Sequence, residues 1–222
     1  MKRLLLGSAI LCVAAAGAAV WAADAPKSST FISAEDVQKV LQLGAKATDH
    51  TIKVVDMGQG YQMSVAIVHR DSTEKARPAA DPAAAAARAA AQAKLANCGS
   101  DPVAAPAGAK VGPANGMLTH DFTAETYIIV KGGGTLVTGG TLFAAKRDPA
   151  DSDMTTTLNG PSCSGKVYGD FKVQNVKVGD IVVIPAGVPH GWSDIPQMVD
   201  YLSVRPDPKH VLPKAGYVYP GL

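Results

Sequence analysis

The stretch from Met117 to Arg205 alternates between short apolar runs and glycine-containing turns, and this pattern constrains the fold most strongly. Predicted strands lie at 117–121, 125–131, 134–138, 141–145, 166–168, 172–177, 180–185, 189–193 and 197–205. Turns are predicted at 132–134, 139–140, 159–165, 178–180 and 185–187. Many short strands separated by glycine turns are typical of a β-barrel or β-sandwich. The sequence therefore predicts an all-β fold.

One helix and two more strands are predicted before this region. Ser33 is a suitable N-cap, and apolar residues recur at helical spacing over 34–46. The periodicity then changes to two, which predicts strands at 51–57 and 61–70 around the turn at 58–60. We therefore divide the chain after the leader into a helical segment, 23–50, and a barrel domain, 51–222.

Residues 72–116 interrupt the barrel pattern with a low-complexity segment of alanine, proline and glycine. Asp81 and Pro82 are good helix-start residues, and Gly99 is a good stop, so 82–97 is predicted to be helical. Apart from Leu95, this helix offers little apolar surface to bury. We interpret 72–116 as an insert that covers one end of the barrel or forms a mobile arm, and a role as a docking arm for a partner stays open.

The amino terminus has the pattern of a secretory signal peptide. Lys2 and Arg3 precede an apolar run from Leu4 to Val20, and small residues follow. We predict a signal peptide at 1–22, cleaved after Ala22, and therefore a periplasmic or secreted protein without a stable membrane anchor. The alternative is a retained anchor, for which a run of 17 residues is at the lower limit of length.

Charge and cysteine content agree with an exported globular protein. Lys and Arg number 21 and Asp and Glu 19, and removal of Lys2 and Arg3 with the leader would leave 19 of each, with no cationic excess for binding nucleic acid. Cleavage would remove Cys12 and leave Cys98 and Cys163, whose only intramolecular pairing is with each other. In an oxidising compartment they would form a disulfide between the insert and a later loop, and two separate thiols are the alternative.

The segment 179–192 carries the most specific motif. Gly179, Pro185, Gly187 and His190 match the spacing G-x5-P-x-G-x2-H, and Asp194 stands where the pattern ends in Asn. This segment resembles the second motif of the cupin superfamily. The resemblance implies a jelly-roll β-barrel in which the motif histidine binds a metal.

A degenerate version of the first cupin motif lies upstream. Gly112, His120, Glu125 and Gly132 fit its spacing, but Leu118 replaces its first histidine. The resemblance then implies a site reduced to His120, Glu125 and His190. Two imidazoles and one carboxylate still suit a divalent ion such as Fe, Mn, Ni or Zn, with coordination positions left open.

His69 is a candidate for the missing fourth ligand. Alternation in the strand 61–70 puts Met63, Val65, Ile67 and His69 on one face, which we take as the barrel interior. The alternative is a partly solvated histidine at a strand end.

The same alternation predicts a pocket beside the metal ligands. Its expected lining residues are Leu118, Ile129 and Trp192, and Tyr127 is a candidate catalytic proton donor. For Tyr127 and Trp192, simple core packing is the alternative. Four further polar residues are expected to be solvated, namely Arg70, Arg205, His50 and His210.

Two classes of function follow from these residues. The first is a metal-dependent enzyme of dioxygenase, isomerase or lyase type that acts on a small molecule in the barrel. The second is a cupin barrel that binds a small ligand without metal or catalysis. The resemblance also implies a homodimer, and it leaves the substrate and the reaction open.

Overall fold

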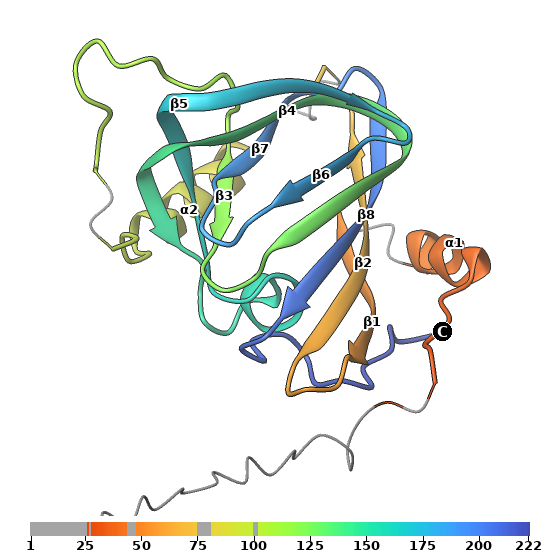
Figure 1. The fold of residues 1–222 in the computed structure, drawn as a ribbon. Helices are drawn as coiled ribbons and strands as arrows, with labels where there is room; N and C mark the ends of the chain where they lie inside the picture. Colours follow the sequence, from red (N-terminus) through yellow and green to blue (C-terminus); the bar gives the residue numbers. More distant parts are fainter. Residues whose placement is uncertain (1–25, 27, 44–47, 75–80, 100–101) are drawn as a thin grey trace, which may run out of the picture.

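A computed structural model describes residue 26 and the ranges 28–43, 48–74, 81–99 and 102–222 (Figure 1). The signal peptide predicted at 1–22 lies outside these residues. Two α-helices, a short π-helical turn and eight strands are described, and they follow one another along the chain in this order. They are α1 Ala34–Leu43, β1 Asp49–Asp56, β2 Gln62–Asp71, α2 Pro82–Ala93, β3 Met117–His120, β4 Glu125–Arg147, η1 Met154–Leu158, β5 Ser162–Lys177, β6 Ile181–Ile184, β7 His190–Asp194 and β8 Met198–Asp207.

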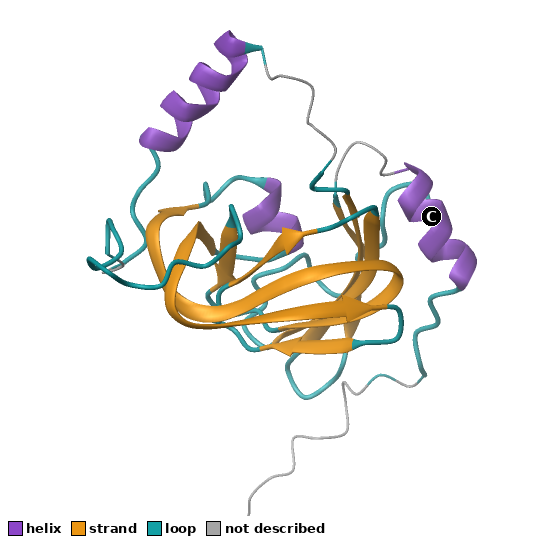
Figure 2. Ribbon diagram, turned by 90° about the horizontal axis from the view of Figure 1, so that it is seen from above, coloured by secondary structure: helices purple, strands orange, loops and turns teal. Residues whose placement is uncertain are grey.

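The strands form a closed β-barrel, so the predicted all-β fold class is confirmed (Figures 1 and 2). The first part of β4 pairs with β6 and β8, and β8 continues through β2 to β1. The second part of β4 pairs with β5 and β7, and β3 pairs with both of these. The long strand β4 therefore belongs to both sides of the barrel and joins them.

Strand β4 replaces three strands that the sequence predicted separately, so the turns expected at 132–134 and 139–140 are wrong. Gly132 has φ +65°, and Gly139 and Gly140 have φ +83°. Register shifts occur beside these positions, between Ile129 and Lys131 and between Gly139 and Thr141. The glycines bend one continuous strand around the barrel, because their backbone reaches conformations that other residues rarely adopt. A Cβ on Gly132 would also lie 1.9 Å from the Met198 carbonyl oxygen.

Strand β5 likewise joins two predicted strands, and it begins at Ser162, inside the turn predicted at 159–165.

Helix α1 and its predicted N-cap, Ser33, are confirmed. The Ser33 Oγ accepts a 3.0 Å bond from the Asp36 N–H, and the Asp36 carboxylate accepts one from the Ser33 N–H. Helix α1 covers the outside of β1 and β2 and buries Val40 against Ile52 and Ile67.

The barrel interior is apolar toward one end and polar toward the other. The apolar cluster includes Val68, Ile129, Leu136, Val199 and Tyr201. Fully buried polar side chains continue the same strands beyond it, namely Gln62, Ser64, Ser203, Arg205 and Asp207. Polar groups are buried at such cost only where they are paired or bind something, so the polar end is where a functional site is expected.

The described part of the insert that follows α2 packs against the barrel. Helix α2 is shorter than the predicted 82–97, and it is capped by the Asp81 carboxylate, which accepts from the Ala83 N–H at 3.1 Å. Beyond it, Asn97 forms a bridge to Lys146, and Val111 forms one to Tyr168. This part of the insert therefore packs on β4 and β5.

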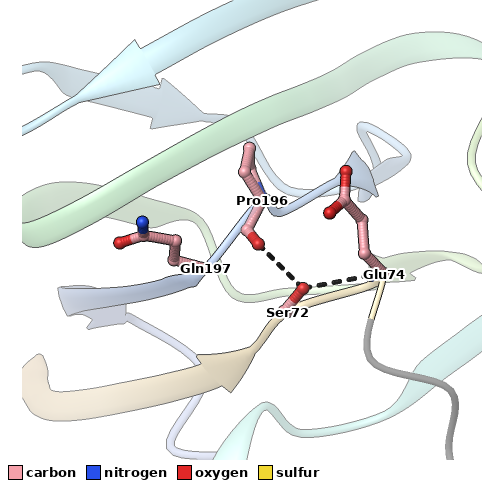
Figure 3. A pocket seen from close by; sticks show the side chains of 4 residues that line it. All are labelled: Ser72, Glu74, Pro196 and Gln197. Atoms are coloured by element: carbon pink, nitrogen blue, oxygen red, sulfur yellow. Dashed lines mark hydrogen bonds between the residues drawn. The ribbon is translucent and has the colours of Figure 1, made fainter.

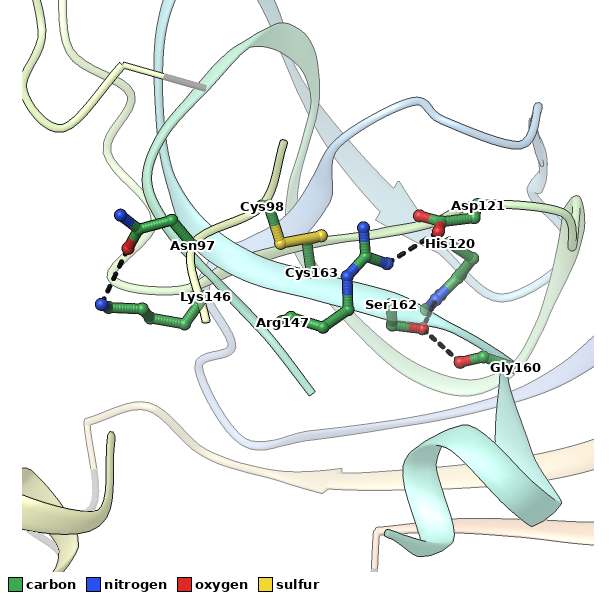
Figure 4. Close-up of a disulfide and its surroundings, with 9 residues drawn as sticks. All are labelled: Asn97, Cys98, His120, Asp121, Lys146, Arg147, Gly160, Ser162 and Cys163. Atoms are coloured by element: carbon green, nitrogen blue, oxygen red, sulfur yellow. Dashed lines mark hydrogen bonds and ion pairs between the residues drawn. A yellow bond between two sulfur atoms is a disulfide. The ribbon is translucent and has the colours of Figure 1, made fainter. Parts of the chain in front are cut away.

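Cys98 and Cys163 form the predicted disulfide, with Cα atoms 6.2 Å apart (Figure 4). Both are buried, in a cluster that includes Met117 and Val137. Cys163 lies in β5 and not in a loop as expected, so the bond fastens the insert to the barrel wall itself. Among the described residues, no helix has the length and apolar character needed to cross a membrane.

Candidate metal centre

His120, Glu125 and His190 come together at the polar end of the barrel interior. His120 ends β3, Glu125 begins β4 and His190 begins β7. The turn before His190 is docked on β3, since the Gly187 N–H donates to the His120 carbonyl at 2.8 Å. Gly187 has φ +80°, which explains why glycine suits this turn. His120, Glu125 and His190 are each only 2% exposed.

The two imidazoles converge on one carboxylate oxygen. The Glu125 Oε2 lies 3.3 Å from the His120 Nε2 and 3.0 Å from the His190 Nε2. One ligand atom from each of the three residues lies within 4.8 Å of the others. The structure thus brings together the three residues that the spacing of the two motifs selected.

Hydrogen bonds on the far side of each ring fix which nitrogen faces the centre. The His190 Nδ1 lies 3.0 Å from the Val188 carbonyl, an acceptor, so Nδ1 carries the proton. The Ser162 Oγ donates to the Gly160 carbonyl, so it accepts from the His120 Nδ1 at 2.7 Å (Figure 4). In neutral rings both Nε2 atoms then present lone pairs, and neither has a hydrogen-bond partner among the described residues.

The charges at the centre are set by burial and by one arginine. Burial lowers the pKa of His120, and Glu125 offsets this only in part, so this ring is neutral at neutral pH. Burial alone would raise the pKa of Glu125, but the charge of the Arg205 guanidinium, the largest lowering cause, holds it well below its usual range. A neutral imidazole and an ionised carboxylate are the forms that bind metal ions.

Tyr127 lies beside the centre, and its OH donates to the Glu125 Oε2 at 2.9 Å. Burial, and then the charge of Glu125, raise the pKa of this phenol well above its ordinary value. Tyr127 therefore keeps its proton and helps to orient the carboxylate, and its role as a catalytic proton donor stays a prediction.

The predicted pocket residues occupy different places. Ile129 is in the apolar cluster, and Trp192 packs against it, with its ring centre 5.8 Å from that of Tyr201. Leu118 is partly buried on β3 and lies opposite His190. The pocket that these three residues were expected to line together therefore stays a prediction. A separate hollow, lined by Ser72, Glu74, Pro196 and Gln197, lies elsewhere, where β2 ends and β8 approaches (Figure 3).

His69 does not join the other three ligands, and the face assigned to it is wrong. Its Nδ1 lies 2.5 Å from the Asp200 Oδ1, and its Nε2 lies 3.6 Å from the Asp71 Oδ1. Val68, its neighbour in sequence, is the residue that enters the barrel core. Both faces of β2 bury apolar residues, because α1 covers the outer one, so alternation alone did not reveal which face is inside.

The sequence reasoning missed Arg205, which it assigned to a solvated strand end. Arg205 is 1% exposed and binds Glu125 directly. The alternation of β8 contained the signal, because Val199, Tyr201 and Ser203 lead to Arg205 on one face. His50 is also not on the surface, since it is 6% exposed and packs edge-on to Tyr219. Arg70 is half-buried and donates to the Tyr201 hydroxyl, whereas His210 is exposed as expected.

Comparisons with known proteins give no family for the chain. No protein-family profile and no curated protein sequence match it. One similar solved structure is the oxalate decarboxylase of Lactobacillus farciminis in a formate complex, with 12% identity and a TM-score of 0.28. That match covers 74% of this chain and 34% of the decarboxylase, so the chain spans about a third of that protein.

Another is peruvianin-I, a cysteine peptidase from Thevetia peruviana latex, with 10% identity and a TM-score of 0.28. This match covers 82% of this chain and 86% of the peptidase. Similarities as low as these two assign no activity to the chain. The evidence for a function therefore lies in the geometry of the site itself.

Proposed function

We propose that this chain is an exported, cupin-like barrel protein that binds a divalent metal ion through His120, Glu125 and His190. The observation that carries the proposal is the convergence of three acceptor atoms in a buried space. When both rings are neutral, two imidazole lone pairs face the Glu125 Oε2 at 3.0 and 3.3 Å, and neither Nε2 has a hydrogen-bond partner among the described residues. Acceptor atoms this close together repel one another unless a proton or a metal ion lies among them.

The distances between the ligand atoms also suit a first-row metal. Metal–nitrogen and metal–oxygen bonds of about 2.0–2.2 Å place neighbouring ligand atoms roughly 3.0–3.5 Å apart. The contacts of the Glu125 Oε2 with the two histidines, 3.0 and 3.3 Å, fall in this range. Two imidazoles with one carboxylate suit Fe, Mn, Ni or Zn better than Mg or Ca.

A bound ion would supply Lewis-acid or redox chemistry for a small molecule that reaches the barrel. The protein's own residues prepare the ligand atoms. Ser162 and the Val188 carbonyl orient the two rings, and Arg205 and Tyr127 orient the carboxylate. Such outer contacts fix the ring tautomers and the direction of each lone pair.

Replacing His190 by alanine should abolish stoichiometric metal binding, because only one imidazole and one carboxylate would remain. The measurement is elemental analysis by mass spectrometry of protein purified without chelators and then reloaded with each metal. We expect about one ion per chain in the wild type and less than about a tenth of that in the variant. His69→Ala is the matched control, because His69 lies outside the centre, and it should keep full occupancy.

A wild-type protein that takes up no divalent ion at micromolar concentration would contradict the proposal. Loss of metal in both histidine variants would point to a general loss of folding, so circular dichroism of each variant accompanies the metal analysis. Retention of metal in His190→Ala would place the ion elsewhere in the chain.

A metal-free barrel that binds a small ligand is the second candidate. The observation that favours it is the ion pair between Arg205 and Glu125, which already gives the carboxylate a cationic partner within the protein. In that case the two Nε2 atoms would receive hydrogen bonds from a ligand donor. Metal analysis of the wild type distinguishes the two candidates.

Export rests on the leader at 1–22 and is compatible with the Cys98–Cys163 disulfide. The expected result is a mature protein that begins at Ala23 when the whole chain is expressed in a bacterium with a periplasm. The intact mass of the protein from the periplasmic fraction tests this. A full-length mass in the membrane fraction would instead support a retained anchor.

A further inference from the structure

The two oxygens of Glu125 have different partners. The Oε1 accepts from the Arg205 Nε and from the Ser203 Oγ, each at 2.8 Å. The Oε2 faces the two histidines and accepts from Tyr127. Since Oε1 is already engaged by two donors, only Oε2 is directed at the metal centre.

Arg205 is itself held from several directions. Its Nη1 donates to the Leu158 carbonyl at 2.9 Å, and its Nη2 donates to the Asp49 carboxylate at 2.6 Å. Its Nε also lies 3.0 Å from the Ser203 Oγ. Each of its three nitrogens has a protein acceptor, so the guanidinium cannot turn to a substrate without releasing Glu125 or Asp49.

We propose that Arg205 is a positioning residue, which holds the Glu125 Oε1 together with Ser203 and so presents Oε2 as a single-oxygen metal ligand. This inference rests on the proposed metal binding. Three protein atoms would then bind the ion, and the remaining coordination positions stay available to other ligands. Without the bonds from Arg205 and Ser203, the Glu125 carboxylate is free to rotate and to bind the ion through both oxygens.

The planar fork of arginine is what this role requires. Glu125, Leu158 and Asp49 are contacted by three different nitrogens whose directions are fixed relative to one another. A lysine ammonium keeps the positive charge between the two carboxylates, but it cannot donate to all three acceptors in the fixed directions of a planar guanidinium. Arg205→Lys therefore separates the loss of orientation from the loss of charge.

The test is cobalt(II) binding to the full mature chain, followed by visible absorption. We expect Arg205→Lys to weaken cobalt binding about 10–100-fold, the usual effect of losing an outer contact to a metal ligand. We also expect its absorption bands to shift and to lose intensity, because a carboxylate that binds through both oxygens raises the coordination number. A merely structural role would lower the thermal midpoint without changing the spectrum of the folded, cobalt-loaded protein.

Arg70→Lys is the matched control, because Arg70 also donates from a barrel strand, to Tyr201, and does not contact Glu125. Its cobalt affinity and spectrum should equal those of the wild type. Ser203→Ala is the second variant, for use if Arg205→Lys fails to fold. It removes one of the two donors to Oε1, and we expect the same spectral change with a loss of affinity of about 10-fold.

Wild-type affinity and spectrum in both Arg205→Lys and Ser203→Ala would overturn the positioning role and leave the proposed metal binding intact. If Arg205→Lys does not fold, an unchanged Ser203→Ala alone overturns it. A wild type that binds no cobalt would overturn both proposals, so the two failures are distinguishable.

Discussion

The variant Arg205→Met should be less stable than the wild type by about 3–5 kcal/mol in the absence of metal. Arg205 is the positive charge that lies between the Glu125 and Asp49 carboxylates, at 2.8 and 2.6 Å. Methionine fills a similar space but leaves both carboxylates without this cation, and the side chain of Glu125 is only 2% exposed. The measurement is urea unfolding of the metal-free proteins at pH 7, followed by circular dichroism.

The pH dependence of this loss has a definite sign. The pKa of Glu125 is lowered in the folded protein, with Arg205 as the largest lowering cause, so its stabilising contribution is present above the unfolded pKa. That contribution is lost as the pH falls from about 4.3 toward the lower folded pKa. The difference in stability between wild type and Arg205→Met should therefore shrink below about pH 4.

The double variant Arg205→Met with Glu125→Gln is the control for charge. It removes the arginine and one of the carboxylates together, and it should recover about half or more of the lost stability, since unpaired charge is the main penalty. A loss below about 1 kcal/mol in the single variant would mean that the guanidinium contributes little net energy. If the double variant recovers no stability, the loss in Arg205→Met comes from packing and not from unpaired charge.

The grouping of His120, Glu125 and His190 could be predicted from the sequence because the geometry that positions them is local. The Pro185–Gly187 turn sets the direction in which the chain reaches His190. The spacing from His120 to Glu125 spans one short loop between β3 and β4. Glycine and proline positions fix such turns almost independently of the rest of the chain. The convergence of the three side chains then followed from closing the barrel.

Other features depend on contacts between distant segments, which a single sequence does not show. A glycine cluster is typical of a turn. At Gly132, however, the neighbouring β8 lies so close that strand β4 continues and bends. The side of β2 that faces the interior depends on helix α1, which buries Ile67 on the outer face. Alternation is informative about the interior only where one face of a strand is polar.

Arg205 illustrates the same limit at the site. Its neighbours come from β1, from the turn at Leu158, from β4 and from β8 itself. A charged residue near a strand end is usually solvated, and only these four partners together make its burial favourable. The sequence showed on which face Arg205 lies, but not that the acceptors would be there.

The second large effect is expected from the disulfide. Replacing both Cys98 and Cys163 with alanine should lower the free energy of unfolding by about 4 kcal/mol, the chain-entropy value for a loop of this size. The two residues are 65 positions apart, and the loop contains the whole described part of the insert beyond Cys98 as well as β3 and β4. Alanine is chosen because both sites are buried among apolar side chains, including Ala114 and Ala145. Urea unfolding of the oxidised wild type and of the double variant measures the difference.

Metal content gives this prediction a second readout. Cys163 follows Ser162, which orients His120, but Ser162 is also held by its pairing with His120 between β3 and β5. We therefore expect the double variant to keep the metal affinity of the wild type while it loses stability. Reductant should destabilise the wild type and leave the double variant unchanged. Equal stability of oxidised wild type and double variant would show that the insert is held to the barrel by its other contacts, such as the Asn97–Lys146 bridge.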